Sequence, residues 1–547
     1  MLLNYLSSIL LAYVLHVSKA SIISVETQYG IVGGFPKISA DGRKYIAFEG
    51  IPYAKPPLGS LRFEPPKPFG KWNGVLTANI TYLCSQVLYL PHGLQMGQED
   101  CLYLNVYIPK SKINQNSKMP VVVNFHGGSF MMLGPKVAAG ELYIMDRDVI
   151  YVNMNYRLGV FGFLSTEDEV VPGNMGLKDQ NLALRWVKEN IDAFGGNPDS
   201  ITIVGVSAGA ASVHYHYISP LSKGLFARGI SQSGSVFNMW ALVKNPAKNF
   251  KTLGNLLKCP EGTREIVNCL KKLPVNEILT AEKKLFKVLE TFPPTLFGPV
   301  VEKGENSFLP DHPYKLLAAG QMEHVPWINS YVKDEGIFMF LPFVYLNKVH
   351  ELDRHWEEMA PYTLYFEETA KSSDWRKIAR DLRSYYLGDT KITKTNTKII
   401  KLFTDRYFLY DGLEALKLHA NNSQAPVYFY RYFYDDGKGM FGVKGVSHGD
   451  DAKLTFNPIM MPRKLASPTS EVKAMLLDLI YEYATKGTPT LNGEEMPVFK
   501  GSTEDLVVNI FSSTNITRTP LGEFDNQAFW DELPIIENKK LFQKRMG

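Results

Sequence analysis

The sequence predicts an α/β protein in which a large, mostly parallel sheet is covered by helices on both faces. Leu177, Leu184, Val187 and Ile191 recur at helical spacing within residues 177–194. Strands that are apolar throughout are typical of parallel sheets buried on both faces, and strands alternating with helices indicate the same architecture. The short apolar runs that we expect to form strands are residues 120–125, 149–154, 201–206, 325–330 and 426–434.

The composition is that of a globular protein. Of the 547 residues 45% are hydrophobic and 21% are charged, which excludes disordered, collagen-like and multi-span membrane chains. The net charge of +4 includes no basic block, so we expect no nucleic-acid partner. No internal repeat or flexible linker is visible, and residues 21–547 are predicted to form a single domain. The sequence assigns no oligomeric state.

The first twenty residues read as a signal peptide, cleaved after Ala20. An apolar run from Leu2 to Val17 ends at Ser18, Lys19 and Ala20, and small residues at 18 and 20 suit signal peptidase. A signal anchor and a buried strand are the alternatives, but about sixteen apolar-biased residues are marginal for a bilayer span. We therefore expect a secreted, extracellular protein without stable membrane association.

The cysteines fit an exported protein. Four cysteines allow three pairings. Pairing neighbours along the chain, Cys84 with Cys101 and Cys259 with Cys269, is favoured because closing a loop of about fifteen residues contributes roughly 3 kcal/mol in the chain-entropy model. Acceptor triplets for N-glycosylation begin at Asn79, Asn421 and Asn515.

The candidate nucleophile is Ser207, in the sequence Gly-Val-Ser-Ala-Gly at residues 205–209. Such a match is weak alone, but here an apolar strand precedes it and small residues that can open a helix follow it. A sharp strand-to-helix turn holds the serine in a strained conformation with its hydroxyl exposed, and the flanking glycines remove side chains that would collide. The same turn aims the amide of Ala208 at the oxygen of a carbonyl under attack.

A second glycine turn, His-Gly-Gly-Ser-Phe at residues 126–130, follows the predicted strand 120–125. A tetrahedral oxyanion needs more than one backbone donor, and this loop can supply further N–H groups. The alternative is a turn that simply ends the strand.

A serine hydroxyl needs a base, and the base needs an acid that orients it. Among eleven histidines, His448 stands in a polar, glycine-flanked loop after the predicted strand 426–434. Glu335 follows the predicted strand 325–330, and Asp334 is the alternative acid. The resulting chain order of serine, acid and histidine is the one found with this kind of serine turn. No metal site is predicted, because His350 and His355 are five residues apart and cannot share one helix face. The chemistry calls for no cofactor.

Long motifs resemble the type-B carboxylesterase/cholinesterase family, and secreted insect carboxylesterases in particular. They are FEGIPYAKPPLGSLRF (48–63), EDCLYLNVY (99–107), HGGSF (126–130), NYRLG (155–159), GNMGLKDQNLALRWV (173–187), FGGNP (194–198), GVSAGA (205–210) and GVSHGDD (445–451). The resemblance implies an α/β-hydrolase fold with a large, mostly parallel twisted sheet. It also implies a triad of Ser207, Glu335 and His448.

The same resemblance extends to further residues. It implies an oxyanion hole formed by the amides of Gly128, Ser129 and Ala208. It implies the disulfides Cys84–Cys101 and Cys259–Cys269, with Ser233 near the triad as a hydrogen-bond partner and Trp240 in the wall of the acyl pocket.

Three positions depart from the family pattern. Val206 stands before the serine, where general carboxylesterases often have Glu and juvenile hormone esterases have Gln. Residues 88–98 lack the tryptophan with which cholinesterases bind the choline cation, so choline is a poor substrate candidate. Ser129 replaces a frequent glycine in the oxyanion loop, and its hydroxyl intrudes there.

We therefore predict a serine esterase that hydrolyses carboxylic esters with apolar, small to medium groups through an acyl-enzyme. The aromatic run 336–345, which contains Phe338, together with Met239 and Trp240, predicts a hydrophobic substrate pocket. A juvenile hormone esterase and a pheromone- or odorant-degrading esterase are alternatives within this class, and a thioesterase or peptidase shares the chemistry. The alternative of another class is a catalytically inactive adhesion or binding protein.

Overall fold

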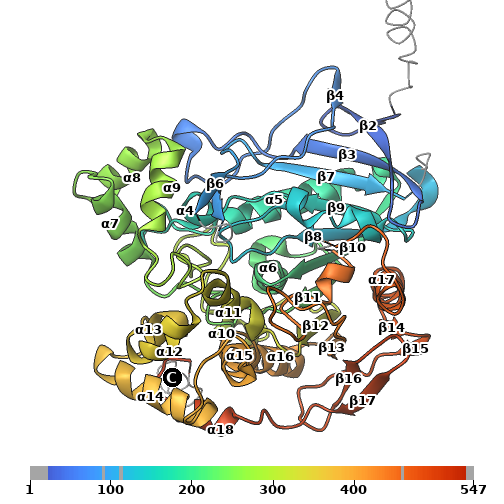
Figure 1. Cartoon of the computed structure of the whole chain (residues 1–547). Helices are drawn as coiled ribbons and strands as arrows, with labels where there is room; N and C mark the ends of the chain where they lie inside the picture. Colours follow the sequence, from blue (N-terminus) through green and yellow to red (C-terminus); the bar gives the residue numbers. More distant parts are fainter. Residues whose placement is uncertain (1–22, 89–92, 110–114, 457–460, 538–547) are drawn as a thin grey trace, which may run out of the picture.

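A twisted mixed sheet runs through the centre of the molecule (Figure 1). The computed structural model describes residues 23–88, 93–109, 115–456 and 461–537, so the predicted signal peptide at 1–20 lies outside the described residues. Within this part of the chain thirteen strands form the large sheet, in the order β1-β2-β3-β7-β9-β8-β10-β11-β12-β13-β16-β17, with β4 paired to β2. The strands from β9 to β16 are parallel, and antiparallel strands extend the sheet on both sides.

The strand bounds are β1 Ile23–Glu26, β2 Ile31–Ile38, β3 Lys44–Pro52, β4 Val75–Thr77, β5 Gln86–Leu88, β6 Leu94–Met96, β7 Tyr103–Ile108, β8 Met119–Phe125, β9 Ile150–Met154, β10 Gly196–Val206, β11 Arg228–Gln232, β12 Trp327–Val332, β13 Val427–Tyr432, β14 Thr490–Leu491, β15 Glu494–Glu495, β16 Leu506–Ile510 and β17 Ile516–Pro520.

The α-helix bounds are α2 Pro135–Ala138, α3 Glu141–Ile144, α4 Gly159–Phe163, α5 Met175–Asn190, α6 Ala208–Ile218, α7 Pro246–Leu256, α8 Thr263–Lys272, α9 Val275–Lys283, α10 Pro313–Ala318, α11 Gly336–Tyr345, α12 Val349–Arg354, α13 Trp356–Thr363, α14 Trp375–Tyr386, α15 Thr397–Thr404, α16 Tyr410–Asn422, α17 Thr469–Lys486 and α18 Gln527–Trp530. One π-helical turn, η6 Asp405–Leu409, joins α15 to α16. The 3₁₀ turns are η1 Gly59–Leu61, η2 Gln115–Ser117, η3 Ile191–Phe194, η4 Pro220–Ser222, η5 Ser372–Asp374 and η7 Ala452–Leu454.

The predicted α/β class is confirmed, and the five predicted apolar runs correspond to β8, β9, β10, β12 and β13. The predicted helix 177–194 is α5 followed by η3. The sequence pattern did not indicate β11, which lies between β10 and β12 and has the mixed sequence RGISQ. Its burial comes from the two strands beside it, because the segment carries little apolar surface of its own.

Both faces of the sheet are buried, and adjacent residues of one strand show this. Val121 and Val123 of β8 lie in one hydrophobic core, whereas Val122 between them lies in a second. Residues of α5 and α6 line the first core, and residues of α17 line the second. Alternate side chains of a strand point to opposite faces, so helices on both sides account for the continuous apolar sequence of β8.

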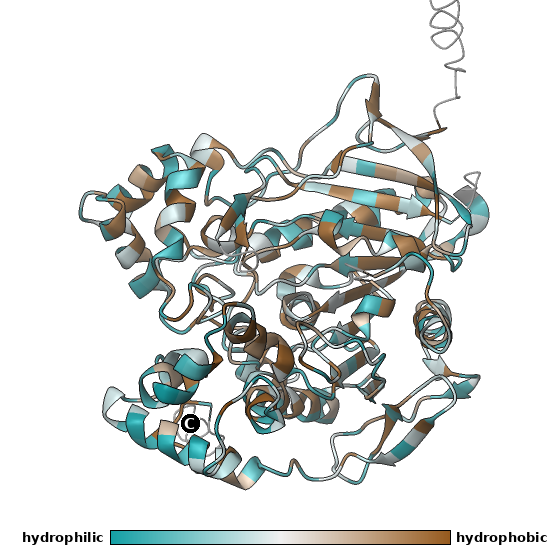
Figure 2. Ribbon diagram, viewed as in Figure 1, coloured by the Kyte–Doolittle hydropathy of each residue, from teal (hydrophilic) through white to brown (hydrophobic). Residues whose placement is uncertain are grey.

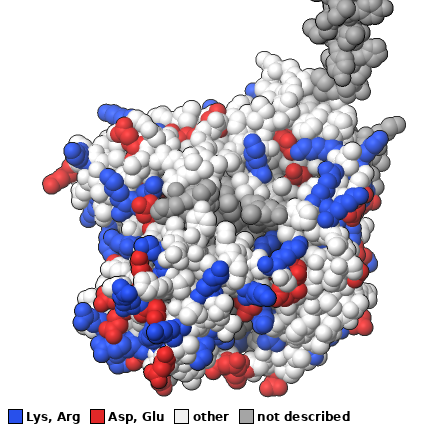
Figure 3. Space-filling model, viewed as in Figure 1, with Lys and Arg blue, Asp and Glu red and all other residues white. Residues whose placement is uncertain are grey.

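The hydropathy colouring separates the interior from the surface (Figure 2). The central strands and α11 are brown, and seven of the ten residues of α11 are buried. On the face drawn in Figure 3, Lys and Arg side chains are intermixed with Asp and Glu side chains. Among the described helices, none has the length and hydropathy needed to cross a bilayer.

The carboxyl ends of the parallel strands carry the predicted site residues. Strand β8 ends before the glycine loop 126–130, and β10 ends immediately before Ser207. Glu335 follows β12 by three residues, and the loop with His448 follows β13. Because parallel strands present their carboxyl ends at one edge of a sheet, this topology gathers the four segments.

Candidate active site

Ser207 occupies the sharp turn between β10 and α6. Its backbone has φ 61° and ψ −123°, a conformation that non-glycine residues rarely adopt. The turn is possible only because glycines surround it. A Cβ at Gly209 would lie 2.0 Å from the carbonyl oxygen of Phe125, and one at Gly205 would lie 2.4 Å from the backbone of Gly209. The local sequence therefore fixes both the strain at Ser207 and its approach to the end of β8.

The glycine loop after β8 packs directly on this turn. A Cβ at Gly127 would stand 3.2 Å from Cβ of Ser207. The loop winds through positive φ values, 110° at Gly128 and 56° at Ser129. Within the described residues no hydrogen bond engages the amides of Gly128 or Ser129. The amide of Ala208 opens α6, where the first N–H groups of a helix lack intrahelical partners.

His126 anchors the start of this loop. Its Nδ1 contacts the carbonyl oxygen of Gly127 at 2.8 Å, and its ring stacks on Tyr156 with the centroids 4.3 Å apart. Burial lowers the pKa of His126 to about 4, although the contact with Gly127 works in the opposite direction. The ring is therefore neutral near pH 7 and brings no positive charge to the loop.

His448 and Glu335 form a direct pair. Nδ1 of His448 lies 2.5 Å from Oε2 of Glu335, and the second carboxylate oxygen accepts the amide hydrogen of Val332 at 2.9 Å. The Glu335 side chain is fully buried, and that of His448 is 7% exposed. Since Nδ1 donates to the carboxylate, the lone pair of the neutral ring is at Nε2.

Asp334, the alternative acid, has a different role. Its amide donates to the carbonyl oxygen of Val446 at 2.9 Å, and its carboxylate accepts the amide of the same residue at 3.0 Å. Asp334 thus ties the histidine loop to the end of β12, and the neighbouring Glu335 contacts the imidazole. The structure separates these two carboxylates, which the sequence left as alternatives.

The histidine loop also reaches the serine turn. A Cβ at Gly449 would lie 3.7 Å from Val206, so the chain neighbours of His448 and Ser207 are in contact. The amide of Ser207 donates to the carbonyl oxygen of Gln232 at 2.9 Å, and the side-chain amide of Gln232 donates to Asp451 at 3.1 Å. Segments more than two hundred residues apart are thereby held together.

Asp451 is a buried carboxylate that the sequence did not single out. It accepts hydrogen bonds from Tyr430 at 2.9 Å, from Ser330 at 3.2 Å and from the side chain of Gln232 at 3.1 Å. Burial raises its pKa to about 6. The Tyr430 hydroxyl opposes this shift, and the charge of Glu335 adds to it. Asp451 therefore links β11, β12 and β13 beneath the pair of His448 and Glu335.

Aromatic rings enclose the imidazole. The ring of Phe338 lies 5.3 Å from that of His448, and the ring of Phe408 lies 4.6 Å from it. Trp240 lies one layer further out, 6.2 Å from Phe408, and its Nε1 donates to the carbonyl oxygen of Tyr407. Met239 is buried in the core beside Trp240. Of the predicted pocket residues, Phe338 touches the imidazole, whereas Trp240 contacts it only through Phe408. Phe408 was missed, and the aromatic content of residues 403–410 was its only sequence signal.

Ser233 also lies against the serine turn. It follows the last residue of β11 and has φ 56°, and its amide donates to the carbonyl oxygen of Ser330. A Cβ at the next residue, Gly234, would be 2.5 Å from the carbonyl oxygen of Ser207. The expected hydrogen bond is absent, because the buried hydroxyl of Ser233 has no partner within the described residues.

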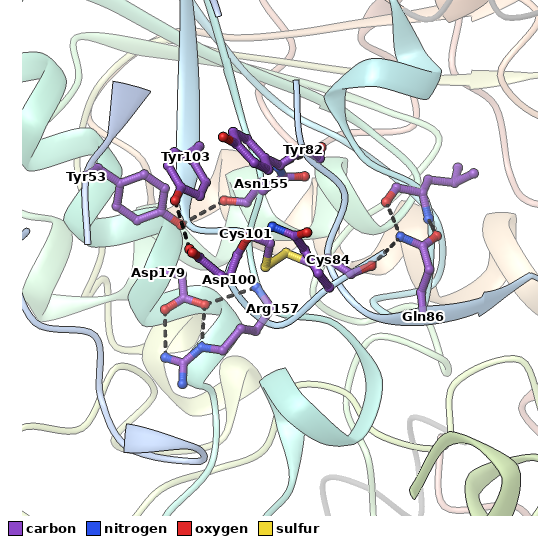
Figure 4. The surroundings of a disulfide bond; sticks show 12 residues. Tyr53, Tyr82, Cys84, Gln86, Asp100, Cys101, Tyr103, Asn155, Arg157 and Asp179 are labelled. Atoms are coloured by element: carbon purple, nitrogen blue, oxygen red, sulfur yellow. Dashed lines mark hydrogen bonds and ion pairs between the residues drawn. A yellow bond between two sulfur atoms is a disulfide. The ribbon is translucent and has the colours of Figure 1, made fainter. Parts of the chain in front are cut away.

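Two disulfides lie on the amino-terminal half of the chain, Cys84–Cys101 and Cys259–Cys269. Around the first, shown in Figure 4, Asn155 donates to the carbonyl oxygen of Tyr82, and Arg157 binds Asp179 through two nitrogen atoms. The acceptor asparagines Asn79, Asn421 and Asn515 are all exposed. No cluster of metal-ligating side chains occurs in the described ranges.

Comparison with known proteins gives a consistent result. A model of the carboxylesterase family matches residues 21–523. Venom carboxylesterase-6 of Apis mellifera is 40% identical, covering 94% of this chain and 95% of that protein. Juvenile hormone esterase of Tribolium castaneum is 37% identical, covering 94% of each. The crystal structure of juvenile hormone esterase from Manduca sexta superposes with a TM-score of 0.82 at 26% identity, covering 96% of this chain and 99% of that one.

Proposed function

The chain belongs to the carboxylesterase family and is a carboxylic ester hydrolase, and we propose that Ser207, His448 and Glu335 carry out its reaction. The observation that carries the assignment is the 2.5 Å contact of His448 with Glu335 on a loop that touches the residue before Ser207. A serine held in a strained turn, a base beside it and a buried acid behind the base are the parts that acyl transfer requires.

The reaction proceeds in two steps. Nε2 of His448 accepts the proton of Ser207 while Oγ attacks the ester carbonyl carbon, and the imidazolium then gives that proton to the departing alcohol. Water, deprotonated by the same nitrogen, hydrolyses the acyl-enzyme and restores the serine. Glu335 keeps Nδ1 protonated and stabilises the imidazolium.

The negative oxygen of each tetrahedral intermediate is bound by the amides of Gly128, Ser129 and Ala208. Their freedom from other hydrogen bonds in the described loop supports this role. Losing one such donor commonly costs about 3 kcal/mol of transition-state stabilisation. Ser129 replaces a frequent glycine of this loop, and its hydroxyl should alter the rates of acylation by bulky or phosphorus-containing reagents.

The substrate is an ester with apolar groups of small to medium size. The rings of Phe338 and Phe408 beside the imidazole, with Trp240 behind them, support an apolar pocket. Hydrolysis of p-nitrophenyl acetate, butyrate and hexanoate, compared with p-nitrophenyl hemisuccinate, tests it. We expect kcat/KM to rise about threefold or more per added methylene until the pocket is filled. Equal values for the charged and the apolar acyl groups would exclude the pocket.

Juvenile hormone esterase activity is a second candidate, favoured by the relatives from Tribolium castaneum and Manduca sexta that carry this name. Val206 stands against it, because this residue departs from the glutamine of such enzymes. Juvenile hormone, assayed beside p-nitrophenyl butyrate, distinguishes the two candidates through the ratio of their kcat/KM values.

The mature protein is a secreted glycoprotein of one domain, residues 21–547. Two disulfides support an oxidising compartment, and the exposed Asn79, Asn421 and Asn515 support glycosylation. Amino-terminal sequencing of secreted material should begin at Ser21, and glycosidase treatment should lower its apparent mass. Retention of residues 1–20 in the exported protein would contradict the signal peptide.

A further inference from the structure

A cavity of about 710 Å³ lies away from the triad. It is bordered by residues 236–246 after β11, by residues 300–301, by α10 and α16, and by residues 536–537. Its lining includes neither Ser207, Glu335 and His448 nor the rings beside the imidazole. The volume is in the range of small-molecule sites, which are mostly apolar with a few polar groups that orient the ligand.

One part of the cavity is apolar. Phe237 faces it and stacks on Tyr314, with the ring centroids 6.0 Å apart, and Leu242, Val300, Leu418 and Ile536 complete this part of the lining. Such a wall can hold an alkyl or aromatic body.

The other part carries an unsatisfied carboxyl group. Asp411 of α16 is 6% exposed, yet its side chain makes no hydrogen bond within the described residues, and Oδ2 is fully buried. Glu537 also lines the cavity, and its Oε2 is likewise buried without a partner. Buried polar groups are nearly always paired, because an unpaired one loses its hydration without compensation. The exceptions therefore point to a missing partner.

The cations near Asp411 do not supply that partner. Arg406 binds Glu537 at 3.3 Å and the carbonyl oxygens of Leu364 and Tyr365 through Nε and Nη2, while its buried Nη1 makes no hydrogen bond to Asp411 or to any other described residue. Lys244 lines the cavity without an ion pair to Asp411 among the described residues. The charged side chains of the lining are the carboxyls Glu167, Asp411, Glu414 and Glu537 and the lysines Lys244 and Lys417, an excess of acidic groups.

We propose that this cavity is a second ligand site, for an organic amine whose ammonium group binds Asp411 and whose apolar body lies along Phe237 and Leu418. An ammonium group supplies the hydrogen-bond donors that Asp411 and Glu537 lack, and the acidic lining favours its charge. A metal ion does not suit the site, since the described residues offer no cluster of ligands for one.

The site shares a wall with the reaction centre. Phe408, in η6, faces His448, and Asp411 follows it by three residues and faces the cavity. Asn238 donates to the carbonyl oxygens of Tyr407 and Phe408, while nearby Val236 and Phe237 line the cavity. Activity is therefore a poor readout, because an amine in either place would alter it.

The test is direct calorimetry on the full chain with Ser207 phosphonylated, so that the reaction centre is blocked. The probes are n-octylamine and n-octanol, which differ in the ammonium group. We expect octylamine to bind about tenfold more tightly or better, and Asp411→Asn to abolish that preference. The matched control is Glu282→Gln, which neutralises a buried carboxyl outside the cavity and should keep the preference.

A second measurement needs no variant. Burial, together with the nearby charges of Glu537 and Glu414, raises the pKa of Asp411 to about 8, while Arg406 and Lys244 oppose this shift. At pH 7 the carboxyl is mostly protonated, so an ammonium ligand should displace close to one proton. Titrations in phosphate and in Tris at pH 7 reveal the release through the difference in heat. Equal affinity for the two probes, an unchanged preference in Asp411→Asn, or binding without proton release would each overturn the proposal.

Discussion

Buried carboxyl groups are hydrogen-bonded by the chain in one region of the molecule and not in another. In the proposed catalytic site and around it, Glu335 and Asp451 are fully buried, and each accepts hydrogen bonds from groups of the chain itself. In the cavity away from the triad, Asp411 is nearly as buried and accepts none from the described residues. A buried carboxylate that accepts hydrogen bonds from the chain needs no ligand to pair it. A buried carboxyl group without such donors indicates a site where a ligand supplies them.

The largest effect should come from the nucleophile. Ser207→Ala removes the attacking oxygen, so we expect kcat for p-nitrophenyl butyrate to fall by about 10⁵-fold or more. Ser233→Ala is the matched control, because this serine also follows a strand with positive φ, and its neighbour Gly234 packs on the same turn. Its loss should change kcat by about tenfold at most, and comparable losses in both variants would show that general disruption, not chemistry, is being measured.

The next effect should come from the acid. Glu335→Gln keeps the shape but removes the charge that holds Nδ1 of His448 protonated, and kcat should fall by about 10³- to 10⁴-fold. Asp334→Asn serves as its neighbour control, since that side chain binds the backbone of Val446. If Asp334→Asn proved the more damaging change, the two carboxylates would have to exchange roles.

A smaller effect should follow from moving the oxyanion loop. A Cβ at Gly128, where φ is 110°, would lie 2.1 Å from the carbonyl oxygen of Met132, so Gly128→Ala must displace the loop. Loss of one donor predicts a fall in kcat of about 10²- to 10³-fold. Gly42→Ala adds a side chain at φ 90° in open space and should leave kcat unchanged. A Gly128→Ala enzyme with normal kcat would remove that amide from the mechanism.

The smallest effect is a difference between Asp411 and Asp451 in how pH changes the stability of the folded protein. The pKa of Asp411 is raised from 3.8 to about 8 in the folded state. Its contribution to stability is therefore fully present below about pH 4, where the carboxyl is protonated in both states, and is lost as the pH rises through 8. Asp411→Asn should therefore gain stability relative to the unsubstituted enzyme up to about pH 9. For Asp451→Asn the gain should stop near pH 6. Thermal unfolding between pH 5 and 9 gives both curves, and parallel curves would contradict the distinction.

The predictable part of the site lay in short stretches of chain. The serine turn, the glycine loop and five of the seven parallel strands could be predicted because each depends on local glycine placement or a continuous apolar run. The antiparallel strands β2, β3 and β7 were not predicted, and neither was β11, because their burial depends on neighbouring strands. The sequence also left Asp334 as an alternative to Glu335 for the acid that orients His448.

The unpredictable residues depend on contacts that cross the chain. Phe408 reaches His448 from forty residues away, and Asp451 meets Gln232 from more than two hundred. The feature that distinguishes Asp411 from other aspartates in helices is that it lines the cavity. Nothing in the residues around these positions distinguishes them, so only the folded structure identifies them.

The most direct test of the central claim is to find the atom that becomes acylated or phosphorylated. Enzyme treated with diethyl p-nitrophenyl phosphate until activity is lost should carry one diethylphosphoryl group, and peptide mass spectrometry should place it on Ser207. The same treatment of Ser207→Ala should leave no adduct. Complete inactivation with the group on another residue, or full esterase activity with Ser207 modified, would contradict the account.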